Sequence, residues 1–563
     1  MSDNSEFQLR SDFITTENLL EWNVSNDHFD KIQDQLKSTG TKLLVGPRGS
    51  GKTHQMKVFQ ENAKSNSELP LCIYISFTKY LYLEPYLTKS TNAIQIFHSW
   101  VLAKIVLSCF DIIDNIDDFN NKLSENGFTF NIDELLNFIA QSERGLVDEQ
   151  DINRYSELTI KKVSDFIDIF RVSKYRKRTV ILFDDAALTL SQEFMVELFD
   201  IIRSFKSTTI SPKASVYPGT TEYGPRFHVG HDGDEVTCWM NLSSPTYSIF
   251  MKSLIENRFS TILEHVPENI LEIFKYASFG IPRAFISLIR NYMEADSGTQ
   301  QSKYNHAIEK QSEFIKIEYL SLIKKMPQYK LVIEVGNEFF NKCVNLLTNV
   351  NKSLNNSIQL TIGVDESSMS SVKLFPRLKQ LLYEAGLIYD LGSVSHGGSR
   401  TYDRFMIHTL FLLNEKAFSA KSRGFNPSNI VIKLKSKQEK HPIRKTILQI
   451  VNQKILDELK LDFPPCLNCQ TPRIAEEQLF CHNCGKELTK ISIFNDCLKV
   501  PVAELSITEW QKSKMTENGY NCIEDFITKK DPASSLRQIY KIGKVKAEKI
   551  SSAVDLFMDE FLS

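Results

Sequence analysis

The distribution of apolar residues along the chain predicts buried strands separated by helices. Three short apolar runs, TKLLV at 41–45, PLCIYISF at 70–77 and TVILF at 179–183, are expected to form strands. The run at 179–183 is continuous, which is typical of a strand buried on both faces of a parallel sheet. The segments 131–140 and 157–170 follow helical patterns. The chain is therefore expected to contain an α/β core built on a parallel sheet.

The most apolar stretch of the chain lies at 93–113. It is interrupted by Gln95, His98 and Lys104, whereas a membrane span needs about 20 predominantly apolar residues with few charges. We therefore expect a buried helix here, and no membrane association.

The first strand runs directly into a glycine-rich segment that fits the pattern G-x-x-x-x-G-K-[ST]. Its residues are Gly46, Pro47, Arg48, Gly49, Ser50, Gly51, Lys52 and Thr53. In such a loop, backbone N–H groups point at phosphate oxygens, and the following helix adds the positive end of its dipole. Lys52 is expected to reach the β- and γ-phosphates, and the Thr53 hydroxyl is expected to ligate Mg²⁺. This pattern predicts a site for ATP and magnesium.

A second strand supplies the acidic groups that such a site needs. Asp184 and Asp185 follow the apolar run at 179–183. Asp184 is expected to hold Mg²⁺ through water, and Asp185 to polarise the attacking water. A helix N-cap is the alternative role for Asp185. Because aspartate is short for the second role, ATP hydrolysis is expected to be slow, or ATP to act only as a switch.

Two further segments complete a recognisable set. The segment 211–227 is expected to be a core strand that ends in polar residues, and 276–294 contains a helix opened by Pro282 and Arg283. Together with the glycine-rich loop and the Asp-Asp strand, they resemble the AAA+ ATPases, most closely the branch of origin-recognition and initiator-loader proteins. The resemblance covers about residues 15–300.

The resemblance implies roles for individual residues. Thr221 would occupy the first sensor position, and Arg283 would be the second sensor, touching the γ-phosphate from a helical lid. Arg226 would lie where an arginine finger could reach the ATP of a neighbouring subunit in an ATP-dependent homo-oligomer. A surface position on a packing helix is the alternative for Arg283. The helical insertion at about 80–175 exceeds the usual connection and is a candidate surface for a protein partner.

The segment 372–413 has the pattern of a helix followed by a β-hairpin. Leu378, Leu381, Leu382 and Ala385 share one helical face, and Gly397-Gly398 suits the turn of the hairpin. This is the tail of a winged helix, which follows the ATPase in origin-recognition-like proteins and contacts DNA. The residues expected near DNA phosphates are Lys373, Arg377, Lys379 and Arg400. Protein contact is the alternative, and the basic segment 431–445 that follows is expected to belong to a solvated linker.

Four cysteines near residue 475 have the spacing of a zinc ribbon. Cys466 and Cys469 form one C-x-x-C pair, and Cys481 and Cys484 form the other. Four thiolates fill a tetrahedral zinc site, so the metal is expected to be structural. A redox dithiol is the alternative, and His482 is expected to be a bystander.

The last sixty residues resemble helix-hairpin-helix domains. In that family a glycine turn exposes N–H groups to a DNA phosphate, but Lys541 here replaces the first glycine of the hairpin. Positive charge is expected to compensate, from Lys541, Lys544, Lys546 and Lys549. A small helical protein-interaction domain is the alternative.

Composition limits the remaining possibilities. The chain has 563 residues, a net charge of −2 and 42% hydrophobic residues, so several domains are expected and any DNA-binding surface must be local. The N-terminal segment 1–13 is polar and has no apolar signal core. Six cysteines outside the paired motif are single, which indicates a reducing compartment. We expect a cytoplasmic protein.

The expected fold class is multidomain α/β, with a parallel-sheet P-loop AAA+ core and helical lid, then winged-helix-like, zinc-ribbon and small all-α helix-hairpin-helix-like domains. The expected boundaries are 15–242 for the core, 243–300 for the lid, 301–430 for the winged-helix-like domain, 431–460 for a basic linker or helix, 461–492 for the zinc ribbon and 500–563 for the helix-hairpin-helix-like domain.

The leading hypothesis is an ATPase whose nucleotide state regulates DNA binding, with ATP, Mg²⁺ and Zn²⁺ as its ligands. Its expected setting is a prokaryotic antiviral defence system or replication or plasmid initiation. The alternative is an ATP-dependent signalling switch that binds a protein partner, through the insertion or the C-terminal modules, without engaging DNA.

Overall fold

The computed structural model describes residues 14–562, apart from 78–82, 91, 114–130, 144–146, 148–157, 186–190, 260–264, 296–297, 399, 419–424, 475–477, 489–496, 528 and 530–531. The polar segment 1–13, which we expected to lack a signal core, lies outside the described residues, as does part of the expected insertion.

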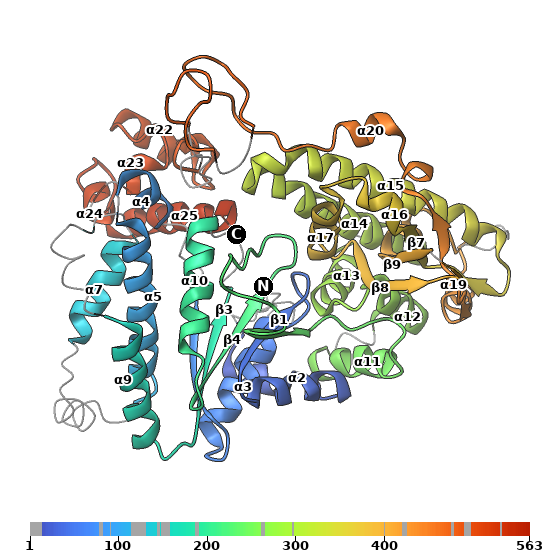
Figure 1. Cartoon of the computed structure of the whole chain (residues 1–563), viewed down its shortest axis with the longest axis horizontal. Helices are drawn as coiled ribbons and strands as arrows, with labels where there is room; N and C mark the ends of the chain where they lie inside the picture. Colours follow the sequence, from blue (N-terminus) through green and yellow to red (C-terminus); the bar gives the residue numbers. More distant parts are fainter. Residues whose placement is uncertain are drawn as a thin grey trace.

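A five-stranded parallel sheet forms the core of the N-terminal half (Figure 1). Its order is β2-β3-β4-β1-β5, and every neighbouring pair is parallel. The strands are β1 (Thr41–Val45), β2 (Leu71–Ser76), β3 (Thr179–Asp184), β4 (Ile210–Val216) and β5 (Gly233–Thr237). The three apolar runs predicted as strands are β1, β2 and β3. Because all strands run the same way, their carboxyl ends meet at one edge.

Alternate residues of each strand enter two different apolar cores, as the period of two in a strand requires. In β3, Val180 and Leu182 face one core, whereas Ile181 and Phe183 face the other. The first core receives α2 (Asp27–Lys37), α3 (Lys52–Ser65) and the helices after residue 246. The second receives α5 (Ala93–Phe110), α7 (Ile132–Ser142), α9 (Ile160–Ser173) and α10 (Gln192–Phe205). This burial on both faces explains the continuous apolar sequence of β3.

Helix α5 lies inside the second core. Within the described part of the chain it is the one helix long and apolar enough to cross a membrane, with a mean hydropathy of 1.6. Phe97 and Trp100 are nevertheless fully buried, and Phe97 stacks on Phe194 of α10 with ring centroids 4.5 Å apart. The prediction of a buried helix at this stretch is confirmed.

A helical segment follows the sheet and leads into a second, mixed sheet. Its helices are α11 (Tyr247–Arg258), α12 (Glu268–Ala277), α13 (Pro282–Glu294), α14 (Gln300–Lys325) and α15 (Lys330–Ser353). As predicted, α13 begins at Pro282. Next come β7 (Thr361–Asp365), α16 (Glu366–Ser370), α17 (Phe375–Glu384), β8 (Ile388–Ser395) and β9 (Thr401–Ile407). Strand β9 pairs antiparallel with both β7 and β8.

The segment 431–460 is not a solvated linker, and this expectation is corrected. Helix α19 (Pro427–Leu434) packs on α12, and the short strands β10 (Lys437–Gln438) and β11 (Ile443–Lys445) pair with β6 (Ser357–Ile358) and β7. Ile447 and Val451 are buried in the first core. The basic residues concealed this packing because apolar residues spaced between them supply the buried face.

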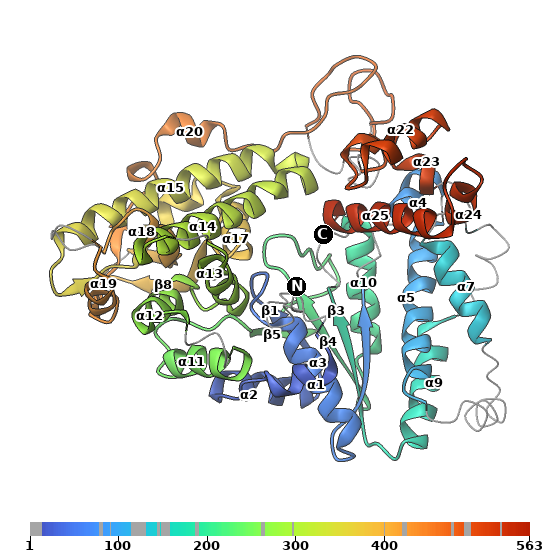
Figure 2. The ribbon, with the colours of Figure 1, turned by 180° about the vertical axis from the view of Figure 1, so that it is seen from behind.

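The C-terminal part is helical and lies against the second core. It contains α22 (Glu509–Glu517), α23 (Glu524–Ile527), α24 (Pro532–Arg537) and α25 (Lys544–Leu562). Figures 1 and 2 show α25 crossing one end of α5 and α10. Ile550 and Met558 of α25 are buried in the same apolar cluster as those helices. The C-terminal helices are therefore packed on the α/β core.

Candidate functional site

The glycine-rich loop connects β1 to the N-terminus of α3. Gly49 and Gly51 have φ angles of +80° and +100°, where an L side chain is strained. A Cβ on Gly49 would lie 2.5 Å from the Cβ of Arg283, so α13 approaches the loop too closely for any side chain there. These two glycines let the loop turn tightly beneath α13.

Lys52, the first residue of α3, is buried beside its own loop. Its Nζ donates to the carbonyl oxygens of Gly46 at 2.6 Å and Pro47 at 3.1 Å, and it lies 3.9 Å from the centre of the Tyr217 ring. Burial lowers the pKa of the Lys52 ammonium from 10.5 to about 8. A buried cation with such partners is suited to bind a phosphate oxygen.

The two aspartates lie at the end of β3. Asp184 is fully buried and accepts a hydrogen bond from the Tyr74 hydroxyl at 2.7 Å. The Asp185 N–H donates to Ser215 Oγ at 2.8 Å, and Asp185 has a φ of +52°. Both carboxylates are close enough to favour the charged form of Lys52. Because Ser191 caps the next described helix, α10, Asp185 is not the N-cap of that helix.

The donor set fits a magnesium ion. A fully buried carboxylate needs a positive partner, and Asp184 lies at the strand edge that also carries the N-terminus of α3 with Thr53. Hydroxyl and carboxylate oxygens are ligands that Mg²⁺ accepts. Thr53 and Asp184 remain the predicted magnesium residues.

Tyr217, which sequence reasoning missed, is the residue at the tip of β4 that contacts both halves of the site. Its ring lies under Lys52, and its hydroxyl donates to Asp185 Oδ1 at 3.4 Å. Thr221, the predicted first sensor, accepts the Tyr217 N–H at 2.9 Å and closes the turn that follows the strand. Its role as a sensor stays a prediction. The available signal was the position of Tyr217, directly after a buried strand.

Arg283 lies at the start of α13, against the glycine-rich loop. Its N–H donates to the Gly49 carbonyl at 3.3 Å, and burial lowers the pKa of its guanidinium. Nε is buried without a hydrogen-bond partner among the described residues. These contacts differ from those of an arginine on a solvated packing helix. Arg226, the predicted finger, is mostly exposed and pairs with Asp200 at 3.1 Å.

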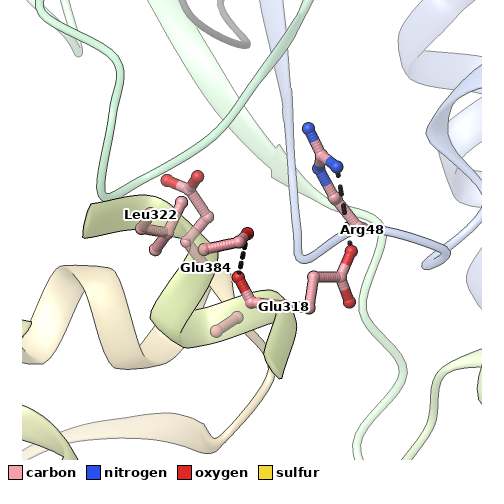
Figure 3. Close-up of a pocket in the computed structure, with 6 residues that line it drawn as sticks. Arg48, Glu318, Leu322 and Glu384 are labelled. Carbon is pink, nitrogen blue, oxygen red and sulfur yellow. Dashed lines mark hydrogen bonds and ion pairs between the residues drawn. The ribbon is translucent and has the colours of Figure 1, made fainter. Parts of the chain in front are cut away.

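Two acidic residues from the C-terminal half complete the wall of the site, and sequence reasoning missed both. Figure 3 shows Arg48 of the loop facing Glu318 of α14, at 3.8 Å. Glu384, the last residue of α17, lies on the other side of the same small pocket. The phosphate-binding loop is therefore enclosed by elements that lie about 300 residues away in sequence.

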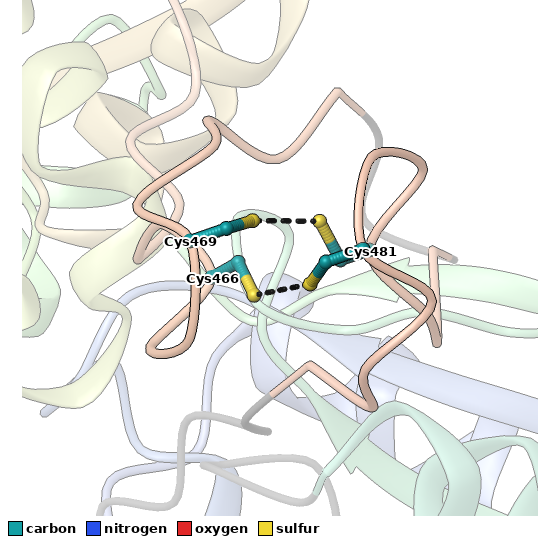
Figure 4. A group of neighbouring side chains, drawn as sticks. Cys466, Cys469 and Cys481 are labelled. Atoms are coloured by element: carbon teal, nitrogen blue, oxygen red, sulfur yellow. Dashed lines mark hydrogen bonds between the residues drawn. The ribbon is translucent and has the colours of Figure 1, made fainter.

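The four predicted zinc cysteines converge. All four Sγ atoms lie within 4.8 Å of one another, and Figure 4 shows the thiols of Cys466, Cys469 and Cys481 turned toward a common centre. The two pairs form similar turns, since Gln470 N–H donates to the Cys466 carbonyl and Gly485 N–H to the Cys481 carbonyl. Hydrogen bonds from Thr471 lower the pKa of the Cys469 thiol to about 6. Such a cluster of thiols fits a tetrahedral zinc ion.

The predicted DNA contacts differ in how freely they face the surface. Arg377 pairs with Glu222 at 3.1 Å, and Lys379 pairs with Asp403 at 2.7 Å. Arg400 is exposed in the β8–β9 hairpin. The lysines of the last module are exposed: Lys541, Lys544, Lys546 and Lys549. Figure 1 shows α25 and the β8–β9 hairpin on different sides of the five-stranded sheet, so these two groups do not form one continuous face.

No protein-family model matches the chain, and no curated protein matches it. Two solved structures have a similar arrangement. One is the Walker-type ATPase PABY2304 of Pyrococcus abyssi, with 15% identity, a TM-score of 0.38, and coverage of 73% of this chain and 99% of that chain. The other is the Aeropyrum pernix ORC1 protein in complex with DNA, with 13% identity, a TM-score of 0.29, and coverage of 69% of this chain and 90% of that chain.

Proposed function

We propose that this chain is an ATP-binding AAA+ protein of the origin-recognition-like branch, whose nucleotide state regulates DNA binding. One observation carries the proposal. The glycine-rich loop, Lys52, the two aspartates and Arg283 meet at the carboxyl edge of one parallel sheet. Each has a distinct task on a bound triphosphate, and the loop touches elements that lead directly to the C-terminal modules.

The chain's own residues divide the work on ATP. The loop N–H groups and Lys52 bind the phosphates, and Thr53 and Asp184 hold Mg²⁺, which neutralises charge on the phosphate oxygens when bound. Asp185 orients the attacking water, with Tyr217 as its hydrogen-bond partner. Arg283 contacts the γ-phosphate from α13, in the role of a second sensor. A short aspartate at this point makes hydrolysis slow.

Three C-terminal modules hold DNA in this proposal. The order α15, β7, α16, α17, β8, β9 supports a winged helix, with Arg400 on its hairpin wing. The cluster of four cysteines supports a structural zinc ribbon. The exposed lysines at the start of α25 support a helix-hairpin-helix contact with phosphates.

One observation favours the second candidate, a signalling switch that binds a protein partner. Arg377 and Lys379 form ion pairs within the chain, so α17 presents less free positive charge than its sequence indicates. The partner would then bind the helical insertion or the C-terminal modules. Within the leading candidate, an ATP-dependent homo-oligomer acting in antiviral defence or in replication initiation remains our proposal.

DNA-binding titrations with and without ATP distinguish the two candidates. The parent protein and Lys52→Ala are compared on single-stranded, duplex and forked substrates. Regulated DNA binding predicts that ATP changes the affinity of the parent and leaves the affinity of Lys52→Ala unchanged. A protein that shows no DNA affinity under either condition supports the signalling switch.

A further inference from the structure

Glu384 connects α17 to the tip of β4. Its side chain is buried. One carboxylate oxygen accepts the Gly219 N–H at 2.8 Å, and the Thr220 hydroxyl donates to the carboxylate at 3.1 Å. Gly219 and Thr220 follow Tyr217 closely in the chain, so Glu384 holds the turn that carries the partner of Lys52 and Asp185.

The contact between these elements is close enough to be mechanically tight. A Cβ on Gly219 would lie 2.9 Å from both Glu384 Oε2 and the Cα of Leu381. Just after α17, a Cβ on Gly386 would lie 3.6 Å from the Cβ of Pro47 in the phosphate loop. The end of α17 therefore touches both the β4 turn and the phosphate loop, and neither can shift far without moving it.

Electrostatics couple the same groups. Arg48 and Glu384 line one small pocket beside the phosphate loop (Figure 3). Burial raises the pKa of the Glu384 carboxyl, and the positive charges of Arg48 and Lys52 act in the opposite direction. Glu384 therefore feels the two cations that a γ-phosphate would approach. A triphosphate adds negative charge near them, which disfavours a buried carboxylate at this point.

We infer that Glu384 is a positioning residue that makes the placement of α17 depend on whether the site holds a triphosphate or a diphosphate. The inference rests on the proposed function, since it assigns the coupling between the nucleotide and the winged-helix-like module to one side chain. Repulsion from the γ-phosphate weakens the attachment of α17 to the β4 turn. A diphosphate, which lacks the γ-phosphate, leaves that attachment in place.

Glu384→Gln tests the inference because glutamine keeps an acceptor for the Gly219 N–H and removes only the charge. Affinities for ADP and for a non-hydrolysable ATP analogue are measured in the parent, in Glu384→Gln and in Glu222→Gln. The last is the matched control, since Glu222 contacts α17 through Arg377 without contacting the β4 turn from α17. We expect Glu384→Gln to raise the triphosphate-to-diphosphate affinity ratio by about tenfold and the control to leave it unchanged.

An affinity ratio in Glu384→Gln equal to that of the parent overturns the inference. Loss of folding in that variant does not protect it, because hydrogen exchange in the parent provides a second measurement. Amides at 217–222 and 375–386 should exchange faster with the ATP analogue than with ADP, and equal exchange also overturns the inference. If the parent binds neither nucleotide, the proposed function itself fails, and the two failures are distinguishable.

Discussion

Lys52 carries a positive charge that burial makes costly. Its ammonium is held by two carbonyl oxygens and an aromatic ring, and its pKa is lowered to about 8. A phosphate oxygen binds the charged form, so affinity depends on the protonation state of this one group.

We therefore predict that ATP affinity falls as pH rises above about 8, by up to about tenfold per pH unit. A lysine with an ordinary pKa would show this loss only above about pH 10. Nucleotide titrations between about pH 7 and 10 measure the effect. Lys52→Arg is the control, because a guanidinium stays charged over this range, and its affinity should not depend on pH in the same way. A constant affinity in the parent across that range contradicts the assignment.

His408 is a second buried titratable residue, and its role is structural. It is fully buried at the N-cap of α18 (Thr409–Asn414), where its Nδ1 accepts the Leu410 N–H at 3.2 Å. Burial lowers the pKa of its imidazole from 6.5 to about 3. The unfolded chain thus takes up a proton below pH 6.5 that the folded chain refuses.

Stability contributed by neutral His408 is complete above pH 6.5 and is lost as pH falls toward 3. In His408→Asn, which retains a capping acceptor, the fall in unfolding free energy between about pH 7 and 4.5 should be smaller than in the parent. Denaturant unfolding at several pH values measures both slopes. Equal slopes would show that His408 is protonated in the folded protein.

At this scale, sequence reasoning identified residues within one motif and missed those brought together by folding. Lys52 and Asp184 lie at strand ends whose position follows from short patterns. Glu384 reaches Gly219 across 165 positions, and no local pattern indicates such a contact. Tyr217 and Thr221 are separated by a turn whose direction depends on its packing against α17.

Among the elements, the loop that carries the four paired cysteines is the most dependent on a ligand. Of its side chains, few are apolar and buried: besides Cys466 and Cys481, Leu488 is buried within its cluster. A segment this small gains most of its folding free energy from the metal. The parent should therefore contain about one zinc ion per chain.

Cys469→Ser should release the zinc and increase proteolysis at 461–492 while ATP affinity stays unchanged, because the loop shares no residue with the nucleotide site. Metal analysis and limited proteolysis measure these effects. Cys522→Ser, a cysteine outside the cluster, is the matched control. A parent protein without zinc would contradict the assignment.

Elements with clear periodicity were predicted well, including β1, β3 and the helices α5 and α13. Segment 431–460 was not, because the dense positive charge concealed residues such as Ile447 and Val451 that complete the core. Short strands such as β10 and β11 have little pattern of their own, and they exist because β6 and β7 offer unpaired edges.

At the scale of the whole molecule, the nucleotide site and the C-terminal modules form one connected structure. The loop touches α13, α14 and the end of α17, and the helices of the last module pack on the second core. An event at the phosphates therefore has physical routes to both candidate DNA-binding parts.

The lysines of the last module provide a separable test of DNA contact. Lys544→Glu with Lys546→Glu should weaken DNA binding and reduce its salt dependence, because fewer counterions are released, while ATP turnover stays unchanged. Lys161→Glu with Lys162→Glu on α9 changes the same charge on exposed residues elsewhere and should leave DNA affinity unaltered. Unchanged affinity in the first variant would move this module to a protein-binding role.

The most direct test of the account is the reciprocity between the two ligands. Binding of a non-hydrolysable ATP analogue is measured without DNA and with saturating duplex, and DNA binding is measured with and without the analogue. If nucleotide state regulates DNA binding, each ligand must change the affinity for the other by the same factor, and Lys52→Ala must lose the effect. Affinities that are independent of the other ligand would contradict the account.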